Sequence, residues 1–261
     1  MQDRERLALE AIAAEMADIP GHLGFYYKNL VTGAAFGVRE DECYGAASVI
    51  KLPLFLHVLR EVKAGRISLD QPIVTEVSDK VGGCGALKMF TGAVETDVRT
   101  LCELMICLSD NTATNRLLRH CTLDGVERGF VAMGLHKTKI RRFLFDHVAS
   151  AAGIQNSICP AELGVLLERL YHGEVVDADA DAYALDVRKR QQINHKMNGK
   201  LCWEVALAHK TGEDDGLSND VGIVYAPQPF VLCFAGHDTD VYRWEDLIRR
   251  GTYELWRAQT E

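Results

Sequence analysis

The chain has 261 residues, of which 48% are hydrophobic and 25% charged, the composition of an ordinary globular protein. Its formal net charge of −8 at pH 7 argues against nucleic acid and acidic membrane surfaces as partners. The longest apolar runs, such as 52–59, are too short to cross a bilayer. A chain of this length forms one large domain or two lobes, with enough core to fold without disulfides.

The N-terminal residues predict a helix over 3–18, ended by Pro20-Gly21. Glu10 and Glu15 interrupt its apolar positions at helical spacing, which is typical of an amphipathic helix and not of a signal peptide. We therefore expect a cytoplasmic protein, or an exported one whose signal has been removed.

Two short strands over 22–30 and 34–38, joined by a turn at Thr32-Gly33, predict a hairpin. The middle of the chain is expected to be helical, with a long loop of no clear period at 135–159. The helices expected there cover about 48–65, 98–108, 112–121, 123–133, 160–170 and 180–192.

The C-terminal part returns to strands at 203–210, 219–225 and 230–235, and a helix over 240–258 closes the chain. This order predicts an α/β fold of the α+β kind, an antiparallel sheet flanked by the N- and C-terminal helices. We expect 1–47 and 201–261 to form the sheet lobe, 48–200 to form an inserted all-helical lobe, and the active site to lie between them.

The eight cysteines include no C-x-x-C pair, and most have apolar neighbours in the sequence. They predict buried thiols in a reducing compartment and favour neither a zinc site nor a disulfide framework. Cys84 lies in a glycine-rich stretch, where it is either a reactive thiol or a small apolar residue that fills a gap.

Ser48 and Lys51 lie three residues apart at the expected start of a helix, so their side chains share one face. The free N–H groups of a helix start can hold an oxyanion, and a desolvated lysine can act as a base. The alternative is that Ser48 caps the helix and Lys51 is a surface residue.

Two further motifs are Ser109-Asp110-Asn111, at a corner between helices, and Lys210-Thr211-Gly212, at the end of an expected strand. Each alone is ordinary turn, capping or strand-end chemistry. Together with Ser48-x-x-Lys51, in this order, they form the motif triple of class A β-lactamases and penicillin-binding proteins. The chain resembles class A β-lactamase-type serine hydrolases over nearly all its length, and that resemblance implies the β-lactamase-like fold.

The resemblance also implies a role for each matching residue. Ser48 would be the nucleophile that accepts the acyl group, and Lys51 would take part in its deprotonation. Ser109 would relay a proton to the leaving nitrogen, with Lys210 holding it electrostatically.

The same resemblance implies the substrate contacts. Asn111 would bind the substrate amide, and Lys210 with Thr211 and Gly212 would bind a carboxylate. The backbone N–H groups of Ser48 and Glu213 would form the oxyanion hole.

One departure concerns the loop glutamate that activates the deacylating water in class A enzymes. No glutamate occurs between Gly134 and Pro160, and its expected position falls near Leu144. The one acid in this segment, Asp146, either replaces the base, with His147 beside it, or pairs with one of the flanking arginines, 141 and 142, to hold the loop. Asn156 is a weaker candidate for the site.

The sequence thus predicts a serine hydrolase with a Ser48 acyl-enzyme, most simply a β-lactamase acting on a small cyclic amide. The alternatives are a cytosolic esterase or amidase, a penicillin-binding peptidase, and a sensor-like protein that deacylates slowly because the glutamate is absent. We expect no metal or organic cofactor, no nucleic acid or membrane partner, and no obligate protein partner.

Overall fold

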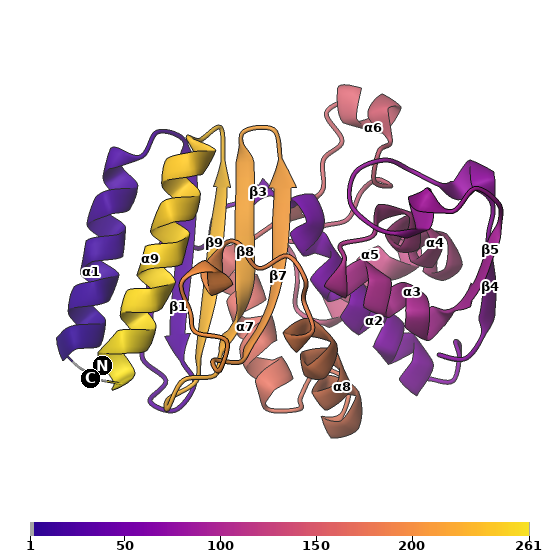
Figure 1. The fold of residues 1–261 in the computed structure, drawn as a ribbon. Helices are drawn as coiled ribbons and strands as arrows, with labels where there is room; N and C mark the ends of the chain where they lie inside the picture. The colour runs from indigo at the N-terminus through magenta and orange to yellow at the C-terminus, as the bar shows by residue number, and fades with distance from the viewer. Residues whose placement is uncertain (1–2, 261) are drawn as a thin grey trace.

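The computed structural model describes residues 3–260 and contains a five-stranded sheet whose neighbouring strands are all antiparallel (Figure 1). The chain's first hairpin and its last three strands build it, which confirms the predicted fold class. Its strand order is β2 (Ala35–Val38), β1 (His22–Asn29), β9 (Phe230–His237), β8 (Leu217–Val224) and β7 (Leu207–Asp214).

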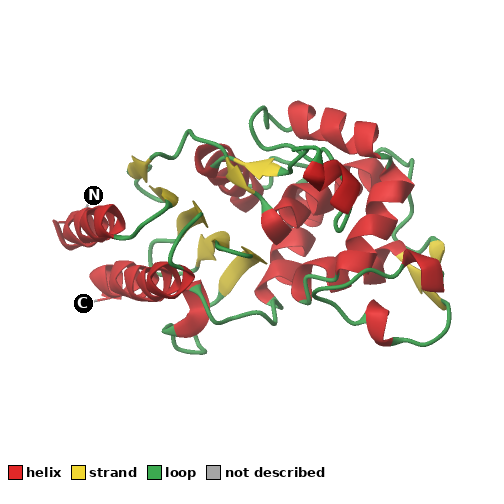
Figure 2. Cartoon of the chain, turned by 90° about the horizontal axis from the view of Figure 1, so that it is seen from above, coloured by secondary structure: helices red, strands yellow, loops and turns green. Residues whose placement is uncertain are grey.

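Helices cover both faces of the sheet. The terminal helices α1 (Asp3–Asp18) and α9 (Val241–Thr260) lie side by side on one face, and α7 (Pro160–Tyr171) packs against β1 and β9 (Figures 1 and 2). The domain division remains a prediction. We note that α7, which falls inside the range 48–200, lies against the sheet because its buried side chains join the core beneath β9.

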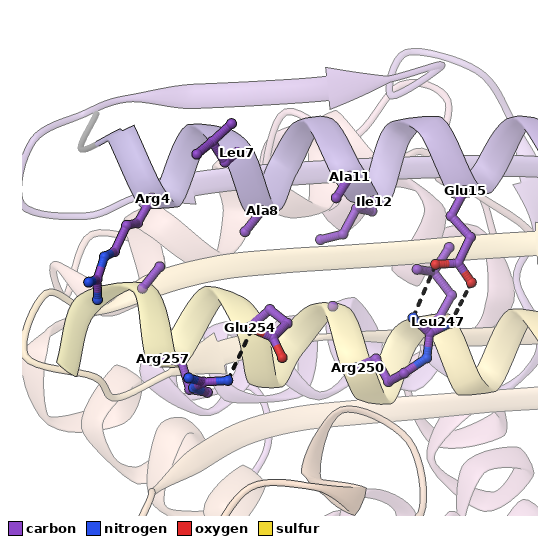
Figure 3. A pocket seen from close by; sticks show the side chains of 12 residues that line it. Arg4, Leu7, Ala8, Ala11, Ile12, Glu15, Leu247, Arg250, Glu254 and Arg257 are labelled. Atoms are coloured by element: carbon purple, nitrogen blue, oxygen red, sulfur yellow. Dashed lines mark hydrogen bonds and ion pairs between the residues drawn. The ribbon is translucent and has the colours of Figure 1, made fainter. Parts of the chain in front are cut away.

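A shallow groove of about 500 Å³ runs between α1 and α9 (Figure 3), at the end of the molecule away from the helical part (Figure 1). Its floor is apolar, with Ile12 and Leu247 among the lining residues. Two ion pairs lie within its walls, Arg250 with Glu15 and Arg257 with Glu254. The groove is therefore part of the helix–helix packing and not of the site described below.

The helical part is organised around α2 (Lys51–Lys63), whose first nine residues are all buried. A short 3₁₀ turn, η1 (Ala47–Ile50), precedes it and packs against β7. The other elements of this part are η2 (Val77–Asp79), η3 (Leu87–Met89), α3 (Val98–Cys107), α4 (Asn111–Cys121), α5 (Leu123–Ala132) and α8 (Ala178–Lys189), whereas η4 (Met197–Gly199) packs against α9 on the sheet.

The small hairpin of β4 (Pro72–Thr75) and β5 (Val94–Asp97) was not predicted, because a long connection separates two short strands. The segment 135–159 is also less irregular than expected. It contains α6 (His147–Ala151) and β6 (Ser157–Ile158), and β6 pairs with β3 (Tyr44–Gly45).

Two sequence predictions need correction. The strand predicted at 203–210 begins at Leu207 and continues to Asp214, so Lys210-Thr211-Gly212 lies inside β7; the preceding Trp203 is 92% exposed and cannot belong to a buried strand. The cysteines are free thiols, but Cys43, Cys84 and Cys202 are exposed, because they lie in loops and not in packed elements.

Within 3–260, no helix combines the length and apolar character needed to span a membrane.

Candidate active site

The first part of the site is the junction between η1 and α2. Ala47 has a φ of +40°, an uncommon left-handed conformation for a residue with a side chain, and Ser48 follows it. The next turn brings Lys51 Nζ to 2.8 Å from Ser48 Oγ. The serine hydroxyl and the lysine amine are therefore in direct contact, as the three-residue spacing predicts.

Lys51 is fully buried, and its amine contacts polar atoms from a second element. Nζ lies 2.8 Å from the Ser109 carbonyl oxygen, 3.0 Å from Ser109 Oγ and 2.7 Å from Asn111 Oδ1. Burial, followed by the nearby charge of Lys210, lowers the pKa of Lys51 well below its usual value. A neutral amine in contact with a serine hydroxyl can accept its proton.

A second lysine, Lys210 on β7, approaches the Ser109 hydroxyl that Lys51 also contacts. Lys210 Nζ lies 3.1 Å from Ser109 Oγ and 2.9 Å from the Thr211 carbonyl oxygen. Burial lowers the Lys210 pKa to about 7, with Lys196 adding to the shift and Asp220 opposing it. Ser109 has a φ of +52°, so strained backbone again holds a polar side chain at the site.

The strand β7 runs directly against the serine. A Cβ atom added to Gly212 would lie 3.1 Å from the Ser48 backbone nitrogen and 3.1 Å from the Ala46 oxygen, so glycine permits this close approach without any shift of the neighbouring backbone. The buried Asn219 side chain donates to the carbonyl oxygens of Gly45 and Ala46, which ties the start of η1 to β8.

A cavity of about 920 Å³ opens in front of Ser48. Asn111 lines it, with its amide nitrogen donating to the Gly82 carbonyl and its oxygen facing Lys51. Glu213 also lines the cavity, whereas Thr211 is buried at 2% exposure and is not among the lining residues. Cys84, from the glycine-rich loop, also lines the cavity as an exposed free thiol.

The loop opposite Ser48 contributes Leu144, Asp146 and His147 to the cavity wall. Leu144 is held at both backbone groups by the Asn115 amide, with two hydrogen bonds of 2.9 Å. Asp146 Oδ1 accepts a 2.9 Å hydrogen bond from the Ala149 N–H and caps α6. Capping is a role that neither sequence interpretation anticipated.

Among the described residues, no ion pair joins Asp146 to either arginine at 141 or 142. Asn156 instead holds this end of the loop, since its side-chain Oδ1 accepts hydrogen bonds from the backbone N–H groups of both arginines. Its carbonyl also accepts from Ala46 N, so it fixes the loop beside Ser48.

Four polar residues that support the site were not predicted as members of it. Asn115 lies four residues after Ser109-Asp110-Asn111 and Asn219 seven residues after Lys210-Thr211-Gly212, and this proximity to the two motifs was the available signal. Asp220 pairs with His209 at 2.9 Å directly behind Lys210, and Lys196 binds the Gly212 carbonyl. No sequence spacing links Lys196 to β7, so nothing in the sequence indicated that Lys196 supports the site.

His195, Glu213 and Glu245 are the described residues grouped closely enough to consider a metal ion. Lys196 Nζ already lies 3.2 Å from a Glu213 oxygen and 3.8 Å from Glu245. The Lys196 ammonium group occupies the place that a metal cation would take, so this cluster is an ion-pair network.

These are the parts of a serine hydrolase: Ser48 with a buried lysine beside it, a second serine that contacts two lysines, and a cavity in front of Ser48. The fold and these parts define the class. A family model described as the beta-lactamase enzyme family matches residues 8–256, and the chain belongs to this family.

Relatives and solved structures agree with that assignment. A beta-lactamase of Streptomyces fradiae is 29% identical over 224 residues, covering 80% of this chain and 72% of the relative. The beta-lactamase structure from Sphaerobacter thermophilus superposes with a TM-score of 0.87 at 25% identity, covering 97% of each chain. PBP-A superposes with a TM-score of 0.86 at 25% identity, covering 99% of this chain and 96% of PBP-A. A leucine-to-glutamate mutant of PBP-A has been solved as an acyl-enzyme complex with penicillin G.

Proposed function

We propose that Ser48 opens β-lactam rings to form an acyl-enzyme ester, and that hydrolysis of this ester is the slow step. Lys51 removes the hydroxyl proton, Ser109 passes a proton to the departing ring nitrogen, and Lys210 with Thr211 binds the substrate carboxylate. The backbone N–H groups of Ser48 and Glu213 stabilise the tetrahedral oxyanion.

The 2.8 Å contact between a fully buried Lys51 amine and Ser48 Oγ carries the acylation half of this proposal. A base of lowered pKa at hydrogen-bond distance is what an ordinary serine hydroxyl needs to become a nucleophile. The acyl-enzyme complex of the PBP-A mutant supports the same first step in a related fold.

The slow-deacylation part of the proposal rests on the loop opposite Ser48. Its cavity wall has Leu144 near the position at which the resemblance to class A enzymes leads one to expect a glutamate, and its Asp146 carboxylate already accepts a backbone hydrogen bond. A leucine side chain cannot remove a proton from the hydrolytic water. General base catalysis is typically worth 10²–10⁴-fold, so its loss lengthens the ester's lifetime accordingly.

A chromogenic cephalosporin tests the proposal directly. We expect a burst of ring opening equal to one molecule per enzyme, followed by a slow steady rate. Steady turnover without a burst would show that deacylation is fast, and an unchanged spectrum would show that β-lactams are not substrates.

The Asp146→Asn variant separates capping from catalysis, because asparagine caps a helix about as well as aspartate. With Asp146 acting as the cap, we expect an unchanged melting temperature and an unchanged slow steady rate. A steady rate that falls tenfold or more in a folded variant would instead identify Asp146 as the water-activating base.

The pH dependence of acylation follows from the two buried amines. Neutral Lys51 is the base, so the rate falls on the acid side as pH drops through its lowered pKa. Protonated Lys210 binds the carboxylate, so the rate also falls as pH rises through about 7. In the acylation rate against pH, we expect the alkaline limb to disappear for a substrate whose carboxylate is esterified. An alkaline limb that persists would contradict the role of Lys210.

The Gly212→Ala variant probes the contact between β7 and η1. The added methyl group must displace the Ser48 backbone by a few tenths of an ångström, which misaligns the oxyanion donors. We expect acylation about tenfold slower, with circular dichroism unchanged, in a stopped-flow measurement. An acylation rate within twofold of the wild type would show that the donors tolerate the shift.

A further inference from the structure

Lys196 is a fully buried lysine whose amine lies against β7 and β8. It directly precedes η4, and its Nζ donates to the carbonyl oxygens of Gly212 at 3.0 Å and Asn219 at 3.1 Å. A carboxylate oxygen of Glu213 lies 3.2 Å away. These three oxygens match the three protons of an ammonium group.

The Gly212 carbonyl and the Glu213 N–H belong to one peptide unit, and in a trans peptide they point in opposite directions. The β7–β8 register gives the direction. Asp214 pairs with Leu217 across a two-residue turn, so Gly212 and Asn219 also form a hydrogen-bonded pair. The Glu213 N–H therefore points away from β8, at the free edge of the sheet that packs on η1.

A cation on a carbonyl oxygen draws electron density from its peptide unit and makes the N–H of that unit a stronger donor. Hydrogen bonds that involve a charged group are also stronger than neutral ones, so the carbonyl is held firmly in place. The Glu213 N–H is the proposed second donor of the oxyanion hole.

We propose that Lys196 is a positioning residue that strengthens the oxyanion hole through the Gly212–Glu213 peptide. This inference rests on the proposed acyl-enzyme at Ser48. Lys196 does not touch the substrate: its ammonium fixes and polarises the peptide whose N–H binds the developing negative charge.

His195 provides a matched control. Its ring lies 3.3 Å from Glu213 and 3.8 Å from Glu245, the two carboxylates that Lys196 also meets, but it is half-exposed and its ring has no contact with the Gly212 carbonyl. His195→Gln therefore alters the same ion-pair network and leaves the peptide's cation in place.

The experiment measures two properties of the wild type, Lys196→Met, Lys196→Arg and His195→Gln. The first is the stopped-flow acylation rate with a penicillin. The second is the infrared stretching band of the ester carbonyl, isotopically labelled in the substrate, because a stronger oxyanion hole shifts this band to lower wavenumber. Circular dichroism verifies folding, and Lys196→Gln, which keeps a donor without the charge, replaces Lys196→Met if the latter does not fold.

We expect Lys196→Met to acylate about tenfold more slowly, less than the 10²–10³-fold typical of losing a whole donor. Its ester band should move to higher wavenumber, Lys196→Arg should restore both properties in part, and His195→Gln should match the wild type. A folded Lys196→Met or Lys196→Gln variant with an unmoved band and a wild-type rate would overturn the role of Lys196 alone. A wild-type protein that forms no ester would contradict the proposed function and this inference together.

Discussion

The Leu144→Glu variant is expected to hydrolyse its acyl-enzyme about 10²–10⁴-fold faster than the wild type, the usual contribution of a general base. Leu144 lines the same cavity as Ser48, and the Asn115 amide fixes its backbone on both sides. A glutamate at this position would therefore begin from an anchored backbone and carry its carboxylate toward the ester. The steady rate that follows the burst, measured with a chromogenic cephalosporin, reports the change.

Leu144→Gln is the matched control, since it has the size and polarity of glutamate without a basic oxygen. We expect it to keep the slow steady rate and the burst of the wild type. Equal steady rates for the glutamate and glutamine variants would mean that the missing carboxylate does not limit turnover at this position.

The second large effect is expected for Lys51→Met, which removes the amine and keeps an unbranched side chain. Acylation should slow by about 10²–10⁴-fold, because the Ser48 hydroxyl loses its base. The substitution also leaves Asn111 Oδ1 and the Ser109 carbonyl without their buried donor, which costs about 1–3 kcal/mol of stability per group. Stopped-flow acylation, with melting followed in parallel, separates the two consequences.

Lys63→Met is the corresponding control, on the same helix but exposed and paired with Asp177 at the surface. Surface pairs contribute little to stability, so this variant should acylate and melt like the wild type. If Lys51→Met acylated as fast as Lys63→Met, another group would have to be the base.

Local sequence patterns predicted the elements that frame the site. Periodicity and capping chemistry located most of the helices, and the Ser48-x-x-Lys51 spacing brought hydroxyl and amine into contact because α2 follows directly. The extent of β7 was misjudged, since the strand continues past Gly212 into a hairpin whose register only the partner strand defines.

The supporting polar groups show where sequence reasoning stops. An aspartate such as Asp146 can act as a base. Its role as the N-cap of α6, however, depends on where that helix begins in the folded loop. Lys196 meets the Gly212 carbonyl across sixteen positions of sequence, and no periodic pattern encodes such a contact. Interactions of this kind arise from tertiary packing, so only the three-dimensional structure reveals them.

We infer that Ser48 is the residue that carries the acyl group, and mass spectrometry of the intact protein after brief exposure to a penicillin can detect this group. We expect one covalent adduct per chain, mapped by peptide digestion to Ser48 and absent from the Ser48→Ala variant. An adduct that persists in Ser48→Ala, or a Ser48→Ala protein that opens β-lactams at the wild-type rate, would contradict it.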